Sequence, residues 1–422
     1  MAAPATGTTQ GAAGAGGPAG GRGAWHRAAR AVYGCRGAGR VGAAGDTHVG
    51  GGGPLQSGPV PARATGRVGW GGRTMKELRV GVIGCGGQGT LHCNNARYVP
   101  GVRTVAYCDA DTPRAERFLQ TYGGAYATGD AQRIIGDPDL DAVFIQTGPT
   151  HHPRLVAAAA RAGKHIFCEK PIALTLGEAQ GVKAAVESAG VRFVYGTCNR
   201  LAPLVQRAQR IVPQPVYSLC QCQDTITHQA VHNLDLAVNL FHASPLVRVY
   251  AQGDDVWHLE RDLPVDSFVA TLTFADRSVH CYIQHGSSRN GTLRKYSYQL
   301  FGRAHCVFLA DRFKRCIVHG SSGEVLQTLS FEGPDFTPQA EGTGDVRGPF
   351  GYMGHCEEIA DLAACVRSGA EPVMTIRDAV HVLAVEKAIL ESAQTSLPVD
   401  FAAFCRRAGI GPGRWGWGDG GV

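Results

Sequence analysis

The sequence predicts an α/β protein whose first domain contains a doubly wound parallel sheet and whose second contains a largely antiparallel one. Three observations support this prediction. Short apolar runs alternate with helix-length segments between residues 76 and 200, a glycine-rich turn follows the first of these runs, and period-two alternation dominates a long stretch after residue 260. A chain of 422 residues is long enough for two or three domains and a sizeable core.

Residues 1–74 differ in composition from the rest of the chain. They hold 22 of the 58 glycines, eight Arg, one Asp and no Lys or Glu, whereas the other residues carry 33 basic and 34 acidic side chains. The basic character of the chain therefore belongs to this segment, which argues against a nucleic-acid-binding protein. Because no apolar period runs through residues 1–74, we expect a disordered tail, either natural or created by a wrongly assigned start ahead of Met75.

Cysteine usage and hydropathy indicate a reduced protein without a membrane span. The 14 cysteines are scattered, and they form no Cys-x-x-Cys pair and no Cys/His cluster with zinc spacing. Several lie within apolar runs, as buried free thiols do. No apolar run reaches the length of about 18 residues that a membrane helix needs. We therefore expect a cytoplasmic protein with no bound metal.

Residues 75–200 follow the pattern of a parallel sheet with crossover helices. Short runs rich in Val, Ile and Ala predict buried strands, and the longer segments between them predict helices. The expected strands are Leu78–Ile83, Val102–Cys108, Asp141–Gln146, His165–Cys168 and Val191–Tyr195. The expected helices are Thr90–Tyr98, Pro113–Tyr122, Arg154–Ala162 and Thr175–Ala189.

Residues 201–402 follow a different pattern and are expected to form the second domain, with residues 403–422 as a frayed tail. Apolar and polar residues alternate over several segments that are separated by turn residues, which predicts an antiparallel sheet with one covered face. The expected strands are Asp266–Phe274, Ser278–Gln284, Tyr296–Phe301, Cys306–Ala310 and Cys316–His319. The expected helices are Leu234–Phe241, His355–Arg367 and Asp378–Thr395, and a long loop is expected at Asp335–Gly351.

The turn after the first strand has the spacing Gly84-x-Gly86-x-x-Gly89. In a strand–turn–helix context, the first glycine permits a tight turn, the second lets a pyrophosphate approach the backbone, and the third lets the helix pack on the strand. This turn, including Gln88, is expected to bind a dinucleotide through the helix amino terminus. Asp109 ends the second strand, where a carboxylate would bind the ribose hydroxyls and repel a 2′-phosphate. The predicted cofactor is NAD, with NADP less favoured.

The fourth strand ends in Phe167-Cys-Glu-Lys-Pro171, at the edge of a doubly wound sheet that faces the cofactor crevice. Lys170 would be placed to polarise or deprotonate a substrate hydroxyl while a hydride leaves the same carbon. Taken alone, a Glu-Lys pair at a strand end is more often a solvated turn.

Several motifs together resemble the glucose–fructose oxidoreductase / inositol dehydrogenase / MocA (Gfo/Idh/MocA) family. The motifs are the turn Gly84–Gly89, the strand-end Asp109, the sequence Cys168–Pro171, the stretch Val194–Arg200, the His-x-x-Asp-x-x-x-x-Leu pattern of the helix Val231–Leu240, and the closing stretch Ser392–Val399. The resemblance implies an amino-terminal Rossmann domain and a carboxy-terminal α/β domain with an open, mostly antiparallel sheet. It also implies a homodimer or homotetramer that forms through that sheet.

The resemblance also implies roles for single residues. Lys170 matches the catalytic lysine of the family, Glu169 would position it beside the cofactor, and His232 matches the histidine that exchanges a proton with the substrate hydroxyl. Asp235 would either position the substrate or support the fold. His228 stands where many members have an acid, and its i, i+4 spacing from His232 predicts a second substrate contact, with a metal pair or a helix-surface residue as alternatives.

Residues with weaker signals complete the predicted site. Thr147 follows the third expected strand and, with Pro149, Thr150 and His151, would contact the nicotinamide ribose. Asn199 and Arg200 would line the substrate crevice, although a surface salt bridge is the alternative for Arg200. His92 is expected to pack or to form a local hydrogen bond.

These features predict an NAD(P)-dependent dehydrogenase that interconverts a secondary alcohol and a ketone of a sugar, amino sugar or cyclitol. An enzyme with a tightly bound cofactor, such as an epimerase, and a non-enzymatic NAD(H)-binding regulator are the alternatives. The missing acid at His228 argues against inositol itself. An Arg-rich coding bias favours antibiotic-sugar or aminocyclitol metabolism, in which Glu260, Asp262 or Asp266 would supply acids near the cleft.

Overall fold

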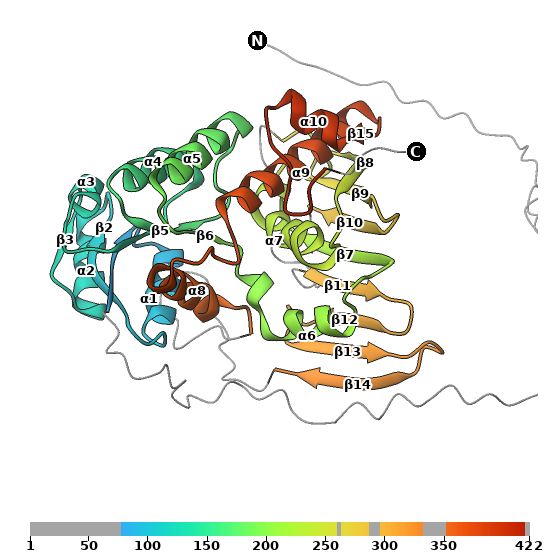
Figure 1. Cartoon of the computed structure of the whole chain (residues 1–422), viewed down its shortest axis with the longest axis horizontal. Coiled ribbons are helices and arrows are strands. Elements are labelled where there is room, and N and C mark those ends of the chain that lie inside the picture. The colour runs from blue at the N-terminus through green and yellow to red at the C-terminus, as the bar shows by residue number, and fades with distance from the viewer. Residues whose placement is uncertain (1–76, 260–262, 287–295, 332–351, 418–422) are drawn as a thin grey trace, which may run out of the picture. The chain divides into compact units, whose positions relative to one another are not determined.

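The computed structural model describes residues 77–259, 263–286, 296–331 and 352–417 (Figure 1). The predictions for residues 1–74, for Asp335–Gly351 and for Glu260 and Asp262 therefore fall outside the described residues. The described residues form two sheets, each with its own helices. None of the helices in this part of the chain combines the length and the apolar character that crossing a membrane requires.

The first sheet has six strands in the order β3-β2-β1-β4-β5-β6, all paired in parallel. Its strands are β1 (Leu78–Ile83), β2 (Val102–Cys108), β3 (Tyr126–Thr128), β4 (Ala142–Ile145), β5 (His165–Glu169) and β6 (Phe193–Gly196). All five predicted strands are present, and only the three-residue β3 was not expected. The strand order reverses between β1 and β4, so the carboxyl ends of these two strands border a crevice in which ligands of this fold bind.

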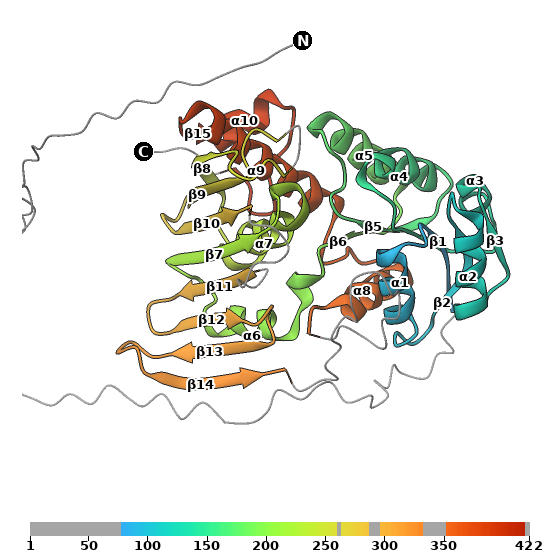
Figure 2. The ribbon, with the colours of Figure 1, turned by 180° about the vertical axis from the view of Figure 1, so that it is seen from behind.

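Helices cover both faces of the parallel sheet. Figures 1 and 2 show α4 and α5 on one side of β5 and β6, with α1 and α8 on the other. Helix α8 comes from the end of the chain and packs against α1, which follows the first strand. The helical elements of this region are α1 (Gly87–Ala96), α2 (Thr112–Tyr122), α3 (Ala131–Ile135), η2 (Pro149–His151), α4 (His152–Arg161), α5 (Leu176–Ala189) and α8 (His355–Ser368).

The second sheet has nine strands in the order β14-β13-β12-β11-β7-β10-β9-β8-β15. Only the β7–β10 pair is parallel, which confirms the predicted mostly antiparallel sheet. Along β9, Phe268, Ala270, Leu272 and Phe274 are buried in strict alternation, as expected for a sheet with one covered face. The strands are β7 (Tyr217–Gln223), β8 (Leu246–Asp254), β9 (Ser267–Phe274), β10 (Val279–His285), β11 (Tyr296–Phe301), β12 (Cys306–Ala310), β13 (Arg315–His319), β14 (Val325–Ser330) and β15 (Val399–Asp400).

The helices of the second domain lie against its covered face and connect it to the first sheet. Helix α9 packs on β8, and α6 packs on β12. Helix α7, which carries the predicted catalytic histidine, is flanked by the π-helical turns η4 and η5. The elements are η3 (Cys198–Leu201), α6 (Pro203–Ile211), η4 (Ile226–Ala230), α7 (Val231–Leu236), η5 (Ala237–Phe241), α9 (Ile376–Thr395) and α10 (Phe401–Arg407).

The prediction of a frayed tail from residue 403 is wrong for residues 403–417. Phe404 and Cys405 on α10 are buried in the core. Farther along, the indole N–H of Trp415 donates a hydrogen bond of 2.9 Å to the carbonyl of Val238. The glycine-rich composition of this segment concealed a few apolar and aromatic anchors, and these are enough to fix its path over the domain.

Candidate active site

The glycine turn between β1 and α1 has the geometry that a dinucleotide site requires. Gly84 has a φ of +103°, and a Cβ at this position would lie 2.6 Å from the carbonyl oxygen of Gln146. A Cβ on Gly89 would overlap the carbonyl oxygen of Gly84, so only glycine lets the helix pack this closely. A Cβ on Gly86 would instead meet no atom within 4 Å, because this glycine faces open space at the start of α1.

A cleft of about 490 Å³ opens beside this turn. Its walls come from the carboxyl ends of β1, β2 and β4, and they include Gly84, Gly86, Asp109, Thr147 and His151. A concave site of this volume at the point where the strand order reverses is the usual place for a cofactor in this type of sheet. The open cradle at Gly86 and the carboxylate at Asp109 therefore fit a bound dinucleotide.

Asp109 is fixed at the end of β2 by three contacts. Its carboxylate accepts the backbone N–H groups of Cys85 at 2.8 Å and of Asp111 at 2.9 Å, and the guanidinium of Arg114 lies 3.1 Å away. Arg114 also contacts the Asp111 carboxylate and lines the cleft. The acid thus lies where a ribose would bind, but it has a neighbouring cation that sequence reasoning did not foresee.

Glu169 ends β5 and is a buried, ionised carboxylate. One oxygen lies 2.7 Å from His92 Nε2, and the other accepts the backbone N–H of Lys170 at 3.1 Å. Burial alone would raise the pKa of Glu169, but the hydrogen bond from His92 and the charge of Lys170 outweigh it and lower the pKa to about 2. His92 packs in the core as expected, since it is fully buried with its ring 4.7 Å from that of Phe167. The expected local hydrogen bond is wrong, because its partner Glu169 lies on another element of the domain.

Lys170 brings the strand end into contact with the second domain. Its Nζ donates a hydrogen bond of 2.6 Å to the carbonyl of His228, in the turn that leads into α7. His232 lies on α7 with its side chain largely buried. Burial and the nearby charge of Lys170 hold the pKa of His232 well below its usual range, so its imidazole is neutral at pH 7.

His228 and His232 have different environments although four residues separate them. The His228 side chain is 50% exposed, and its Nδ1 lies 2.7 Å from the carboxylate of Asp224. Many family members have an acid at the position of His228. This chain instead has an acid four residues earlier, Asp224, and that acid pairs with His228. Nδ1 of His232, in contrast, is buried and has no hydrogen-bond partner among the described residues.

Arg200 and Asp235 pair with each other in the core. Arg200 Nε donates to Asp235 Oδ2 at 2.9 Å, a second guanidinium nitrogen contacts Asp235 Oδ1, and Arg200 also donates to Asp378 at 3.0 Å. Both side chains of the first pair are fully buried. This arrangement argues against the predicted substrate contacts of Arg200 and Asp235 and favours the structural role that was open for Asp235. The alternative considered for Arg200 was a surface salt bridge. Arg200 does form salt bridges, but they are buried.

The remaining predicted residues divide into accessible and enclosed groups. Gln88 is exposed in the first turn of α1, and Thr147 is partly exposed in the cleft wall. Asn199 is fully buried, and its amide nitrogen has no hydrogen-bond partner among the described residues. The proposed cleft acid Asp266 is also buried, and its carboxylate accepts the backbone N–H groups of Val256 and Trp257, so the prediction that it meets a cationic substrate is wrong.

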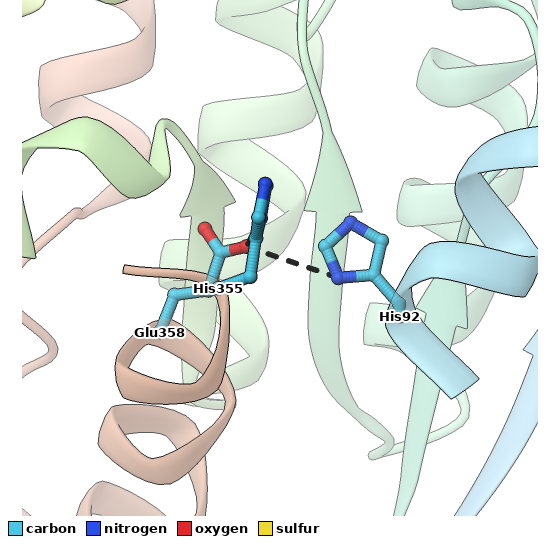
Figure 3. Close-up of side chains that lie close together, drawn as sticks. All are labelled: His92, His355 and Glu358. Carbon is cyan, nitrogen blue, oxygen red and sulfur yellow. Dashed lines mark hydrogen bonds and ion pairs between the residues drawn. The ribbon is translucent and has the colours of Figure 1, made fainter. Parts of the chain in front are cut away.

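One cluster near the site was not predicted. His92, His355 and Glu358 meet where α1 packs on α8 (Figure 3). The local signal that could have indicated it is the i, i+3 pair His355-x-x-Glu358, which places both side chains on one face of α8. The contribution of His92 could not be read from the sequence, because it depends on how α8 returns to the first domain.

The fold and the cleft define a dinucleotide-binding oxidoreductase of the Rossmann type, and comparison with known proteins identifies its family. Residues 78–197 match the model of an oxidoreductase family with an NAD-binding Rossmann fold, and residues 224–401 match the model of its carboxy-terminal α/β domain. The chain belongs to the Gfo/Idh/MocA oxidoreductase family. The resemblance predicted from the sequence, the two-domain α/β fold and the NAD-binding Rossmann domain are thereby confirmed.

The similar proteins include several dehydrogenases. The scyllo-inositol 2-dehydrogenase (NAD(+)) of Bacillus subtilis (strain 168) is 26% identical over 346 residues, which span 76% of this chain and 96% of that protein. The uncharacterised oxidoreductase YrbE of the same organism is 29% identical over 220 residues, which span 47% of this chain but only 64% of that protein. A solved structure of levoglucosan dehydrogenase with NADH and levoglucosan has a TM-score of 0.66 at 22% identity, over 77% of this chain and 100% of that one.

Proposed function

We propose that this chain is an NAD-dependent dehydrogenase that oxidises a secondary alcohol of a sugar, amino sugar or cyclitol to a ketone, or catalyses the reverse reaction. The observation that carries the proposal is the 2.6 Å hydrogen bond from Lys170 Nζ to the carbonyl of His228. This bond joins the strand edge at the cofactor crevice to the turn η4, which leads into the helix that bears His232. Family relatives that act on scyllo-inositol and bind levoglucosan support this substrate class.

The residues of the first domain would hold the cofactor. The backbone of Gly84, Gly86 and Gln88 would bind the pyrophosphate at the amino terminus of α1, Asp109 would bind the adenosine ribose, and Thr147 would contact the nicotinamide ribose. Bound NAD⁺ supplies the hydride acceptor for the carbinol carbon.

His232 and Lys170 would manage the proton of the substrate hydroxyl. As the hydride leaves the carbon, the O–H bond breaks and the C=O bond forms, so a base must take one proton. The neutral imidazole of His232 has one unprotonated nitrogen, which would take this proton. The ammonium group of Lys170 would donate a hydrogen bond to the same oxygen and stabilise the negative charge that develops there. Glu169, ionised and fixed by His92, would hold the end of β5 in register for this contact.

The test is the absorbance at 340 nm when the purified chain is mixed with NAD and a panel of cyclitols, sugars and amino sugars, with NADP in parallel. We expect at least one polyol to reduce NAD. On that substrate, Lys170→Ala should lower kcat/KM by about 10²- to 10⁴-fold. Lys183→Ala, which removes a surface lysine paired with Glu187 on α5, is the matched control and should leave kcat/KM unchanged. Tight NADH binding without turnover of any member of the panel, or full activity in Lys170→Ala, would contradict the proposal.

We also infer that two or four copies associate through the uncovered face of the nine-stranded sheet. Val269 on β9 is 48% exposed, and Tyr217 on β7 presents a second exposed apolar side chain. Both lie on the face opposite the buried row of β9. Light scattering coupled to size-exclusion chromatography should give the mass of a dimer or tetramer, and Val269→Glu should shift it toward the monomer. A wild-type monomer would contradict this inference.

We further infer a cytoplasmic location from the state of the thiols. All cysteines in the described ranges are free, and most are buried. Proteins of oxidising compartments more often pair their cysteines. Fractionation of the source cells should recover the chain with cytoplasmic markers, and recovery from a secreted fraction would contradict the inference.

A further inference from the structure

Three side chains of types that bind metal ions meet between α1 and α8, beside β5 (Figure 3). Glu358 Oε1 lies 3.0 Å from His355 Nδ1 and 3.8 Å from His92 Nδ1. One ligand-type atom from each of the three residues lies within 4.8 Å of the other two. All three side chains are buried, so two imidazoles and a carboxylate from distant parts of the chain lie together away from solvent.

His92 is held in the tautomer that a metal ligand needs. Its Nε2 lies 2.7 Å from the Glu169 carboxylate, which can only accept, so the ring hydrogen resides on Nε2 and leaves a lone pair on Nδ1. Nδ1 is buried and has no hydrogen-bond partner among the described residues, and it is directed toward Glu358. A histidine that donates one N–H to a carboxylate and turns its other nitrogen to a metal is the usual arrangement in protein metal sites.

His355 and Glu358 differ in how their polar atoms are matched, since both nitrogens of His355 have neighbours and one oxygen of Glu358 does not. His355 Nε2 lies 3.7 Å from Cys198 Sγ, so the nitrogen that faces away from the cluster also has a neighbour. Glu358 Oε2 is buried and has no hydrogen-bond partner in the described part of the chain. His92 Nδ1 and Glu358 Oε2 are thus left unmatched, while Glu358 Oε1 is the carboxylate oxygen that faces both histidines. A cation held by His92 Nδ1 and by the Glu358 carboxylate would give a partner to both unmatched groups.

The separations also suit a small ion. Bonds of about 2.0–2.1 Å to nitrogen and oxygen place tetrahedral ligands about 3.3 Å apart. The two measured separations, 3.0 and 3.8 Å, lie on either side of this value. The third lies within 4.8 Å, and a small rotation of either imidazole would shorten it.

We propose that His92, His355 and Glu358 bind one divalent transition-metal ion, with Zn²⁺ the ion that this donor set favours. Two imidazole nitrogens and one carboxylate oxygen suit Zn²⁺, whereas Mg²⁺ and Ca²⁺ prefer sites built from oxygen. Three protein ligands leave one tetrahedral position for water. The ion would cross-link α1 to α8, and through His92 it would stiffen the hydrogen bond to Glu169, the neighbour of Lys170. It would not touch the substrate.

Metal content tests this proposal without any turnover, so its outcome is independent of the proposed function. Tag-free, full-length protein is stripped with a chelator, incubated with Zn²⁺ or Co²⁺, desalted and analysed by plasma mass spectrometry. We expect about one Zn²⁺ per chain and the visible absorption of tetrahedral Co²⁺. His355→Ala and Glu358→Gln should each retain less than about a tenth of the wild-type metal, with circular dichroism confirming that they are folded.

Two control variants separate this site from its rivals. His381→Ala removes another buried histidine, on α9, and should keep the full metal content. His228→Ala tests the alternative pair His228 and His232 and should also keep it. If folded wild-type protein binds no Zn²⁺ or Co²⁺, if it binds only Mg²⁺ or Ca²⁺, or if His355→Ala and Glu358→Gln bind as much metal as wild type, the proposal is overturned.

Discussion

Two buried polar clusters connect distant parts of this chain, and they differ in how completely their polar groups are matched. The first, which we term the closed cluster, consists of Arg200, Asp235 and Asp378, which are buried, and Arg414, which is partly exposed. Two guanidinium groups face two carboxylates, with Arg414 at 2.8 Å and Arg200 at 3.0 Å from Asp378. Burial would raise the pKa of Asp378, but the two guanidinium charges outweigh it and lower the pKa to about 2. The two positive charges of this cluster therefore balance its two negative charges.

The second, which we term the open cluster, consists of Glu169, His92, Glu358 and His355. Its two carboxylates have opposite shifts, because burial raises the pKa of Glu358 well above its usual range while His92 and Lys170 help to lower that of Glu169 to about 2. His92 Nδ1 and Glu358 Oε2 have no hydrogen-bond partners among the described residues. A matched cluster of this size supports the fold, whereas an unmatched one beside β5, the strand that leads to Lys170, points to a ligand or to chemistry.

The largest expected effect is at His232, the proposed proton acceptor on α7. His232→Asn should lower kcat by about 10²- to 10⁴-fold, because no neutral imidazole remains to take the hydroxyl proton. His228→Asn, the matched change on the half-exposed histidine, should cost less than about 10-fold. Steady-state kinetics on the polyol that reduces NAD measure both. Equal losses of kcat in the two variants would contradict the proposal that His232, and not His228, accepts the proton.

The closed cluster should give the largest change in stability. Arg200→Met leaves Asp235 and Asp378 buried without their shared cation, and we expect the free energy of unfolding to fall by about 3–5 kcal/mol. Urea denaturation measures the change. Arg377→Met removes an exposed salt bridge to Glu187 and should cost less than about 1 kcal/mol. A loss at Arg200 no larger than this control would mean that the closed cluster does not support the fold.

A buried histidine outside both clusters contributes to the pH dependence of stability. His242 is bonded only to the hydroxyls of Ser218 and Ser278 in the described structure, and burial lowers its pKa to about 4. As the pH falls, His242 is protonated in the unfolded chain near pH 6.5 but in the folded chain only near pH 4. The contribution of His242 to stability is therefore complete above pH 6.5 and is lost as the pH drops toward 4. The expected contribution is about 3 kcal/mol.

The matched variant for this prediction is His242→Gln, which keeps a polar side chain but cannot titrate. The free energy of unfolding should be measured for both proteins at pH 7 and at pH 4. The wild type should lose more stability over this range than the variant does. Identical losses would show that His242 keeps an ordinary pKa in the folded chain.

The smallest expected effect concerns cofactor choice in the cleft. Asp109→Ala removes the carboxylate that we propose binds the ribose, and it should weaken NAD binding by about 10-fold, the size of one hydrogen bond to a charged group. Arg114→Ala should weaken NAD binding less than Asp109→Ala does. It should weaken NADP binding more than it weakens NAD binding. Quenching of tryptophan fluorescence by each dinucleotide measures the affinities. An Asp109→Ala variant that binds NAD as tightly as wild type would contradict the assigned role.

The parts of the molecule that could be predicted are those determined by residues close together in the sequence. The turn Gly84–Gly89 needs three glycines at fixed spacing, and Asp109 follows a recognisable strand, so both could be located from a single chain. The alternating segment of β9 was equally clear. In contrast, β7 is rich in Cys and Gln and has little apolar alternation to reveal it.

What the sequence did not reveal depends on tertiary packing. The contact between His92 and Glu169 spans 77 residues, and no pattern of residues indicates that it forms. Arg200 and Asp235 looked like crevice residues because their motifs flank the site, yet both side chains turn into the core. The order of elements could be predicted, but which polar side chains meet depends on how α8 and α9 return to the first domain.

The most direct test of this account compares one matched substitution in each cluster, Glu169→Gln and Asp378→Asn, with kcat and melting temperature measured on the same preparations. Both replace a buried carboxylate with an amide of the same shape. We predict that Glu169→Gln lowers kcat at least 10-fold with a small change in melting temperature, and that Asp378→Asn lowers the melting temperature while kcat, measured below that temperature, stays within about 2-fold of wild type. The reverse pattern, or the same pattern in both variants, would contradict the division between a cluster that serves the reaction and one that serves the fold.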